Sequence, residues 1–260
     1  MKKVIIISID GMRPDGLMNC KNPFVEEMKK LGSYTFGART VFPSITLPCH
    51  LSLFHSVPPE RHGTLNNTYS VPVRPVEGLF ELVAGAKGSC AMFYNWDPMR
   101  QVASFNCLQH SAFIHAYSVE SSDTVNTDRA LECIEKFGCN LVYLYMVETD
   151  EKGGHDNGWM SEEYLRRISI AVDNVKRVIE RFGDEYTVII MADHGGHDRS
   201  HGTDMPEDMT VPLFMRGARF EGGAPLEDAS LLDIAPTIAD VMGIAPDGDW
   251  EGRSFASQNA

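Results

Sequence analysis

The sequence predicts an α/β protein of three layers, in which helices cover both faces of a mostly parallel central sheet. Two patterns support this fold: short β-branched apolar runs recur along the chain, and segments of helical periodicity separate them. Length is the third observation, since 260 residues with 43% hydrophobic composition can bury one large core. We therefore expect a single domain over residues 1–260, with a small cap or irregular excursion at about residues 66–120.

Buried apolar runs predict strands at residues 3–9, 34–41, 88–94, 111–117, 139–148, 185–193 and 211–217. Amphipathic segments predict helices at residues 22–32, 47–56, 78–86, 124–137, 161–183 and 233–243. Pro23 and Gly32 mark the ends of the first helix, because proline favours a first turn and glycine favours the residue after the last turn. Ser161 and Gly183 delimit the longest helix, with Ser161 as its candidate N-cap.

Composition excludes several classes of partner. The net charge of −13 argues against nucleic acid polymers and anionic membranes, although a bound metal would still permit an anionic small molecule. No apolar run reaches the roughly 18 residues of a membrane helix, and the N-terminal run is shorter than a secretory signal requires. The six cysteines form no C-x-x-C pair, so we expect reduced thiols and a cytoplasmic location.

Three aspartates follow three of the predicted strands. Asp10 comes directly after the first strand, Asp150 just after the strand at 139–148, and Asp193 ends the run at 185–193. Ligands of open parallel sheets bind at the carboxyl ends of the strands, so we expect these carboxylates to meet at one edge. Carboxylates held together repel each other unless a cation neutralises them. The pattern therefore predicts a metal site.

The segment MADHGGHDRSHGTDM (191–205) holds three of the chain's nine histidines. His194 follows Asp193 directly, and the two glycines after it supply a turn that can aim both side chains at one ion. A mixture of histidine and aspartate suits zinc or manganese better than calcium or magnesium. The alternative interpretation is a polar turn that merely ends a strand.

Thr46, in FPSITLPCH (42–50), lies between a predicted strand and a predicted helix. Free N–H groups and the dipole at a helix N-terminus favour an anion or an alkoxide there. The alternative is that Thr46 is simply the N-cap of that helix. No G-x-S-x-G, G-x-G-x-x-G or Walker A motif is present, so the sequence indicates neither a serine-triad hydrolase nor a nucleotide-binding loop.

Six segments in order resemble the alkaline phosphatase superfamily, in particular its nucleotide pyrophosphatase/phosphodiesterase (type I phosphodiesterase) branch. They are SIDGMRPD (8–15), FPSITLPCH (42–50), PERHGTLNN (59–67), ETDEKGGHDNG (148–158), ADHGGHDRSHG (192–202) and LLDIAPTIADVMG (231–243). The resemblance runs nearly end to end and implies an alkaline-phosphatase-like fold. It also implies two divalent metal ions, zinc first and manganese as the alternative.

The resemblance assigns residues to both ions. One ion would be held by Asp10, Thr46, Asp193 and His194. The other would be held by Asp150, His155 and His201. Thr46 would be the nucleophile, and Asn67 would contact a non-bridging phosphoryl oxygen, with Asn66 as the alternative to it.

The chain departs from the family pattern at two positions. Asp150 and His155 are spaced DxxxxH where the family has DxxxH, and the extra residue could be absorbed at Gly153 and Gly154. Cys49 replaces the asparagine that usually precedes the histidine in PNH, a position expected to support the loop. His197 matches no ligand position, so we expect it to support the ligands or face the substrate rather than to be an ordinary exposed histidine.

The resemblance implies a metal-dependent hydrolase of small-molecule phosphate esters, most plainly a phosphodiesterase or nucleotide pyrophosphatase that forms a phospho-threonine. A phosphomonoesterase or phosphonate hydrolase of the same superfamily is the alternative, followed by a non-catalytic metal-binding module. A sulfatase is disfavoured because no CxPxR motif occurs, and a phosphoglycerate-type mutase because the chain has no room for a large inserted domain. Four aromatic residues could stack on a base or pack in the core: Phe93, Tyr94, Trp96 and Phe105.

Overall fold

A single seven-stranded sheet forms the centre of the protein. The computed structural model describes residues 1–72, 74–104, 106–220 and 226–256, so Phe105 lies outside the described residues. The strands are β1 (Lys3–Ile9), β2 (Ser33–Arg39), β3 (Cys90–Tyr94), β4 (His110–Phe113), β5 (Leu141–Met146), β6 (Tyr186–Met191) and β7 (Thr210–Arg216). Their order across the sheet is β2-β7-β6-β1-β5-β3-β4.

The sheet is mostly parallel, as predicted. Strands β6, β1, β5, β3 and β4 pair in parallel, and β7 runs antiparallel to its neighbours β6 and β2. Strand β1 is central, with Ile5 opposite Val142 on one side and opposite Val188 on the other. Because β1 is buried on both faces, a continuous apolar run suits it better than an alternating one.

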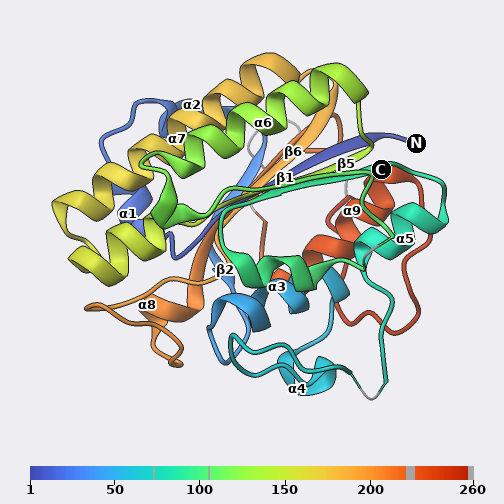
Figure 1. Cartoon of the computed structure of the whole chain (residues 1–260), viewed down its shortest axis with the longest axis horizontal. Helices are drawn as coiled ribbons and strands as arrows, with labels where there is room; N and C mark the ends of the chain where they lie inside the picture. Colours follow the sequence, from blue (N-terminus) through green and yellow to red (C-terminus); the bar gives the residue numbers. More distant parts are fainter. Residues whose placement is uncertain (73, 105, 221–225, 257–260) are drawn as a thin grey trace.

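Helices cover both faces of the sheet (Figure 1). One layer contains α1 (Pro14–Asn19), α2 (Phe24–Leu31), α6 (Ser122–Phe137) and α7 (Glu162–Phe182). The other contains α3 (Thr46–His55), α5 (Leu79–Gly85) and α9 (Ile234–Met242). The predicted three-layer α/β/α fold is therefore confirmed. Ser161 caps α7, as predicted, by accepting a hydrogen bond from the backbone N–H of Tyr164 at 3.2 Å.

Short elements complete the chain. These are α4 (Pro59–His62), α8 (Pro206–Met209), the 3₁₀ turns at Asp97–Val102, Ala116–Ser118 and Leu231–Asp233, and a π-helical turn, η3 (Thr149–His155). The sequence patterns did not predict α1, α4 and α8, because helices of four to six residues show too little periodicity. The segment 66–120 contributes β3 and β4 to the main sheet. Among the described residues, no helix is both long and apolar enough to span a membrane.

Candidate active site

The three aspartates lie at the carboxyl ends of three neighbouring strands. Asp10 directly follows β1, Asp193 follows β6 by two residues, and Asp150 lies in η3 just beyond β5. Since β6, β1 and β5 are adjacent in the sheet, their ends converge at one edge. All three side chains are buried.

The first group of candidate ligands is Asp10, Asp193 and His194, whose ligand atoms lie within 4.8 Å of one another. His194 Nε2 is 3.3 Å from Asp10 Oδ1 and 3.4 Å from Asp193 Oδ2. Thr46 joins this group, since its Oγ1 is 3.1 Å from His194 Nε2. Thr46 is the first residue of α3, and Ile45 occupies the N-cap position without a side-chain cap. The alternative role of Thr46 as an N-cap is therefore wrong.

The second group is Asp150, His155 and His201, again within 4.8 Å of one another. His155 Nε2 is 3.4 Å from Asp150 Oδ2, and His201 Nε2 is 3.9 Å from Asp150 Oδ1. The π-helical turn explains the unusual spacing of Asp150 and His155. Residues five apart face each other where hydrogen bonds run from i to i+5, so η3 absorbs the extra residue.

Hydrogen bonds orient the three histidines with Nε2 toward the aspartates. Nδ1 lies near a backbone carbonyl in each: 2.7 Å from Gly195 for His194, 3.0 Å from Arg199 for His155 and 2.9 Å from Ser44 for His201. A carbonyl can only accept, so Nδ1 carries the hydrogen and Nε2 keeps its lone pair in the neutral ring. This is the orientation of metal-binding imidazoles.

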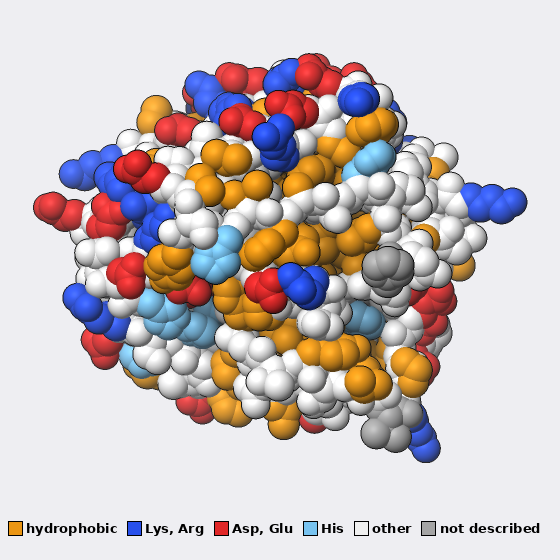
Figure 2. Space-filling view, in the orientation of Figure 1, with side chains coloured by type: hydrophobic (Ala, Val, Ile, Leu, Met, Phe, Trp, Pro, Cys, Tyr) orange, Lys and Arg blue, Asp and Glu red, His pale blue; other side chains and the backbone are white. Residues whose placement is uncertain are grey.

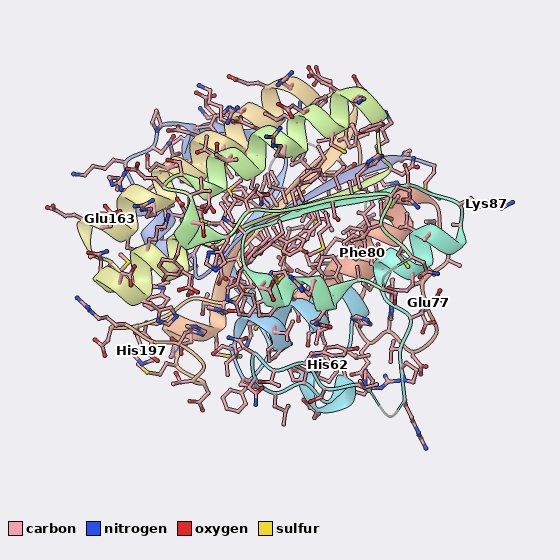
Figure 3. All side chains as sticks on the ribbon, in the orientation of Figure 1. His62, Glu77, Phe80, Lys87, Glu163 and His197 are labelled. Atoms are coloured by element: carbon pink, nitrogen blue, oxygen red, sulfur yellow. The ribbon has the colours of Figure 1, made fainter. Side chains whose placement is uncertain are left out.

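The two groups adjoin each other. The rings of His194 and His201 stack with centroids 3.9 Å apart and planes inclined by 14°. In the space-filling view, histidine side chains gather at the left end of the molecule (Figure 2). Figure 3 places His197 at that same end, below Glu163 at the start of α7, whereas Lys87 lies at the opposite end. Of the ligands, His155 has a side chain that is 36% exposed, whereas the aspartate and histidine side chains of the first group are at most 1% exposed, so the second group lies nearer to solvent.

The buried carboxylates of the site have the properties expected of ligands to divalent cations. Three buried oxygens, Asp10 Oδ1, Asp150 Oδ1 and Asp193 Oδ2, have no hydrogen-bond partner, which is rare for buried polar atoms. Burial, with the charges of Asp193 and Asp150, raises the pKa of Asp10 well above its ordinary value. Burial also lowers the pKa of His194 well below its usual range. Divalent cations would neutralise the carboxylates and bind the neutral imidazole.

In the second group, the contact with Asp150 favours the protonated form of His155 when no cation is bound. The hydrogen bond to Asp150 raises the pKa of His155 to about 9. Burial raises the pKa of Asp150, but its contacts with His155 and His201 outweigh burial and lower it. A cation entering this group would displace the His155 proton, because a ligating imidazole must offer its lone pair.

Several residues that support the site were not predicted. Tyr145, on β5, donates a short hydrogen bond from its hydroxyl to Asp10 Oδ2. His50 lies beneath the first group, with Nδ1 2.8 Å from the carbonyl oxygen of Thr46, and burial lowers its pKa to about 4. Gly11 adopts φ +64°, and a Cβ there would lie 2.8 Å from Asp150 Oδ1. Only glycine lets the backbone pass so close to that carboxylate.

The Tyr145→Phe substitution should lower metal affinity by about 10-fold. The Tyr145 hydroxyl orients the Asp10 carboxylate, and loss of a group that orients a metal ligand typically weakens binding by about this factor. The matched control is Tyr143→Phe on the same strand, since the Tyr143 hydroxyl is buried without a hydrogen-bond partner. Isothermal titration with zinc measures both variants. Equal affinities in the two would exclude this role of Tyr145.

The remaining predicted residues have defined positions. Asn67 Oδ1 accepts a hydrogen bond from the backbone N–H of Leu47 at 3.0 Å, which places it at the start of α3. Asn66 instead accepts from the N–H of Thr68 at 2.8 Å, as a turn residue does. Thr46 lies next to Leu47, so the geometry favours Asn67 over Asn66.

Two further predicted positions lie around the ligands. His197 lies in neither ligand group; its Nδ1 is 2.7 Å from Asp208 Oδ1, a buried carboxylate that also accepts two hydrogen bonds from Thr203. Cys49 is buried, and its sulfur lies 3.2 Å from the hydroxyl oxygen of Thr40, which donates its hydrogen to the carbonyl oxygen of Asp193. Cys49 therefore lies in the support of the first ligand group.

A charged network holds η3 in place. Buried Glu148 precedes η3 and accepts hydrogen bonds from Lys152 at 2.7 Å and from Arg167 at 2.9 Å. Its Oε1 also accepts from the backbone N–H of Ser122 at 2.9 Å. These contacts tie η3 to α6 and α7. The signal for Glu148 in the sequence was weak, because a lone glutamate after a strand resembles a surface residue.

Family models and known proteins match this chain in sequence. A model of type I phosphodiesterase/nucleotide pyrophosphatase matches residues 4–130, and a model of the metalloenzyme superfamily matches residues 99–246. A phosphopentomutase of Symbiobacterium thermophilum is 28% identical over 144 residues, covering 55% of this chain and 35% of that protein. Human ectonucleotide pyrophosphatase/phosphodiesterase family member 1 is 23% identical over 219 residues, covering 74% of this chain and 23% of that protein. The chain thus spans well under half of either relative.

Solved structures share the fold. An inactive variant of murine ectonucleotide pyrophosphatase/phosphodiesterase 5, in complex with AMP, superposes with a TM-score of 0.81 at 15% identity, covering 100% of this chain and 98% of that one. A phosphonate monoester hydrolase from Silicibacter pomeroyi superposes with a TM-score of 0.77 at 14% identity, covering 100% of this chain and 76% of that one. The predicted resemblance is confirmed: the chain belongs to the metalloenzyme superfamily, and its fold is alkaline-phosphatase-like.

Proposed function

We propose that the protein is a metal-dependent hydrolase of phosphate esters, of the phosphodiesterase/nucleotide pyrophosphatase type, that acts through a phospho-threonine. The observation that carries this proposal is the position of the Thr46 hydroxyl. It lies at the N-terminus of α3, 3.1 Å from His194 Nε2 and beside the carboxylates of the first ligand group. A hydroxyl in this position suits nucleophilic attack on a phosphoryl group bound at the helix N-terminus.

The chain's own residues would divide the reaction as follows. Thr46 Oγ1 gives up its proton to solvent and attacks phosphorus, while the bond from phosphorus to the leaving-group oxygen breaks and that oxygen takes up a proton from solvent. Water then hydrolyses the phospho-threonine, which restores the Thr46 hydroxyl and releases the phosphate product. The Asn67 carbonyl oxygen is occupied by the Leu47 N–H, so its amide N–H groups remain to donate to a non-bridging phosphoryl oxygen. The first group, with Asp10, Thr46, Asp193 and His194, would hold one cation, and the second group the other.

Two divalent cations, zinc or alternatively manganese, would activate the hydroxyl and offset the charge that develops on the phosphoryl oxygens. The donor set supports this choice, since each group combines histidine nitrogen with carboxylate oxygen. Three carboxylates and an ionised Thr46 carry four negative charges, which two divalent cations balance.

A small-molecule nucleotide or related phosphate ester is the proposed substrate. The match of residues 4–130 to the type I phosphodiesterase model supports it, as does the AMP bound to the structurally similar murine protein. The net charge of −13 disfavours a nucleic acid polymer.

Hydrolysis of bis-p-nitrophenyl phosphate and of p-nitrophenyl phosphate, each with and without a chelator, tests the proposal. We expect faster turnover of the diester, lost in the chelator and restored by zinc or manganese. Preference for the monoester would contradict the diesterase assignment in favour of a phosphomonoesterase. Turnover of neither ester, nor of an aryl phosphonate, would indicate a non-catalytic metal-binding module.

A second candidate is phosphoryl transfer of the phosphopentomutase type. It is favoured by the 28% identity to the Symbiobacterium protein over 144 residues. Interconversion of two isomeric pentose phosphates, without release of inorganic phosphate, would support this candidate over hydrolysis.

The Asn67→Ala substitution should lower kcat/KM for the favoured ester by about 10²-fold, the cost of removing one preorganised donor to a developing oxyanion. Asn66→Ala is the matched control and should change kcat/KM little, because Asn66 only closes a turn with Thr68. Steady-state kinetics separates the two. A larger loss in Asn66→Ala would transfer the role to that residue.

A further inference from the structure

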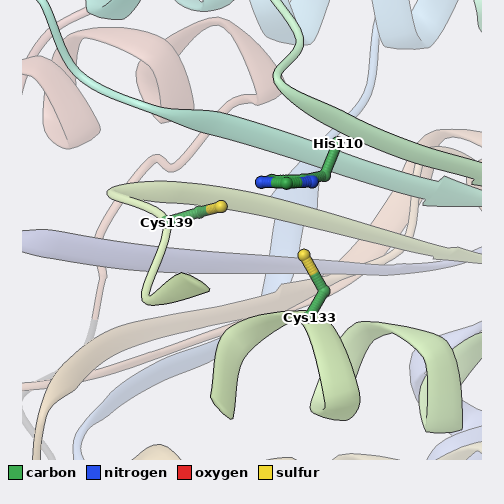
Figure 4. Close-up of side chains that lie close together, drawn as sticks. All are labelled: His110, Cys133 and Cys139. Carbon is green, nitrogen blue, oxygen red and sulfur yellow. The ribbon is translucent and has the colours of Figure 1, made fainter. Parts of the chain in front are cut away.

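A separate group of metal-ligating side chains lies at the end of the sheet where the parallel strands begin, opposite to the carboxyl ends of the strands that carry the candidate active site (Figure 4). His110 is the first residue of β4, Cys139 lies two residues before β5, and Cys133 lies in the last turns of α6. One ligand atom from each lies within 4.8 Å of those of the other two. In Figure 4 the two sulfur atoms and the imidazole ring face a common space.

The fold brings the two cysteines together through a tight helix end. Gly138 adopts φ +61° and its N–H donates to the carbonyl of Ile134 at 2.9 Å, which closes α6 and turns the chain back. Cys139 thereby lies beside Cys133. The Tyr186 hydroxyl donates to the Cys139 carbonyl at 3.0 Å, so the segment entering β5 is fixed.

His110 is held in place independently. It pairs with Ala91 of β3 in the sheet, and its ring stacks on Phe137 with centroids 3.9 Å apart and planes inclined by 18°. The imidazole is half-buried, whereas both thiols are buried. A hollow on the surface is lined by His110, Cys133 and Glu132, among others, and gives an access route from solvent.

We propose that His110, Cys133 and Cys139 form a third metal site, which takes one soft divalent cation, zinc foremost. Two sulfurs and one imidazole are the donors that select zinc among the common divalent cations. Ligand atoms around tetrahedral zinc lie about 3.5–3.8 Å apart, as follows from bond lengths of about 2.0–2.3 Å. The separations here, all within 4.8 Å, need only small side-chain adjustments to reach that geometry.

Proton balance is simple at this site. Both thiols lose their protons to solvent as two zinc–sulfur bonds form, the imidazole stays neutral, and the site ends with no net charge. Burial raises the pKa of both thiols, to about 12 for Cys133, so neither is a reactive thiolate in the metal-free chain. The cation would tie the edge strand β4 to α6 and to the start of β5. It would stabilise the folded chain because only the folded chain, and not the unfolded chain, would bind it.

Cobalt substitution tests this proposal separately from the proposed function. Thiolate bound to Co²⁺ gives a near-ultraviolet charge-transfer band, whereas the Asp–His site at the other edge offers only nitrogen and oxygen. We therefore titrate the reduced, metal-stripped full chain with Co²⁺ and expect the intensity of the thiolate band at saturation to correspond to one thiolate-bound Co²⁺ per chain. Absence of that band at saturating Co²⁺ would overturn the proposal, whatever the hydrolytic activity.

Variants assign the band to these residues. Cys133→Ser/Cys139→Ser should lose the band and one zinc per chain, while the control Cys20→Ser, at a buried cysteine elsewhere, keeps both. His110→Ala keeps both thiols and tests the site if the double variant does not fold; its Co²⁺ affinity should fall by about 10-fold or more. An unchanged affinity in His110→Ala, or a Cys133–Cys139 disulfide in the mass spectrum of protein purified without reductant and bearing no zinc, would contradict the site.

Discussion

Replacing Thr46 with alanine should lower kcat by about 10³-fold or more, because a reaction that depends on a side-chain nucleophile loses its first covalent step. The Thr46 hydroxyl lies 3.1 Å from His194 Nε2, and Asp10, Asp193 and His194 remain in the variant. We therefore expect the metal content to stay that of the wild type. Diester hydrolysis measured together with elemental analysis checks both expectations.

Thr46→Ser is the control for the alanine variant. It keeps a hydroxyl at the start of α3 and should retain a large part of the activity, while the alanine variant does not. Mass spectrometry after rapid quenching of wild-type turnover should find on Thr46 a phosphoryl group that still bears the second ester group of the diester. Wild-type turnover in Thr46→Ala would remove Thr46 from the nucleophilic role.

The Asp193→Asn substitution should act in opposite directions on the metal-free and metal-bound protein. Without cations, burial and the charge of Asp150 raise the pKa of Asp193 to about 8. Above the ordinary aspartate pKa, folding must either bury the Asp193 charge or bind a proton, so replacing this group with a neutral amide should raise the free energy of unfolding of chelated protein by on the order of 1–3 kcal/mol. With zinc present, the same change should weaken binding by more than about 100-fold, because a charged ligand is lost.

The raised pKa of Asp193 also sets how the stability of the chelated protein depends on pH. A group with a raised pKa in the folded state stabilises the chain most below the ordinary aspartate pKa of about 4. That contribution is lost as the pH rises toward about 8, the pKa of folded Asp193. Chelated wild-type protein should therefore lose stability over this range relative to Asp193→Asn. Urea denaturation at several pH values in a chelator measures the difference.

Asp204→Asn provides the matched control, since it removes the same charge from an exposed side chain of the neighbouring loop. It should leave both the stability difference and zinc binding nearly unchanged. If Asp193→Asn bound zinc as tightly as the control, or were less stable than the wild type in a chelator, Asp193 would not be a carboxylate held for a cation.

The strand-end residues could be predicted from the sequence because the pattern there is local. Asp10 and Asp193 each follow a β-branched run almost directly, and parallel strands bring such positions to one edge. Likewise, Ser161 before an amphipathic segment was sufficient to locate the start of α7.

Features that depend on contacts between distant segments could not be predicted. No characteristic amino-acid pattern marks a π-helical turn such as the one between Asp150 and His155. The spacing of these two residues could therefore be recognised only as a departure from the family pattern. Tyr145 and His50 resemble ordinary core residues in a strand and a helix, and only the fold brings them to the ligands. Short helices such as α8, with four residues, are shorter than the window of roughly 11 residues over which a helical period can be recognised.

The most direct measurement is anomalous scattering at the zinc edge from crystals grown with zinc. Two peaks about 4 Å apart should lie at the carboxyl ends of β6, β1 and β5. One should be bound by Asp10, Thr46, Asp193 and His194, and the other by Asp150, His155 and His201. A single peak at this edge, or none within bonding distance of Thr46 Oγ1, would contradict the two-metal, threonine-based account.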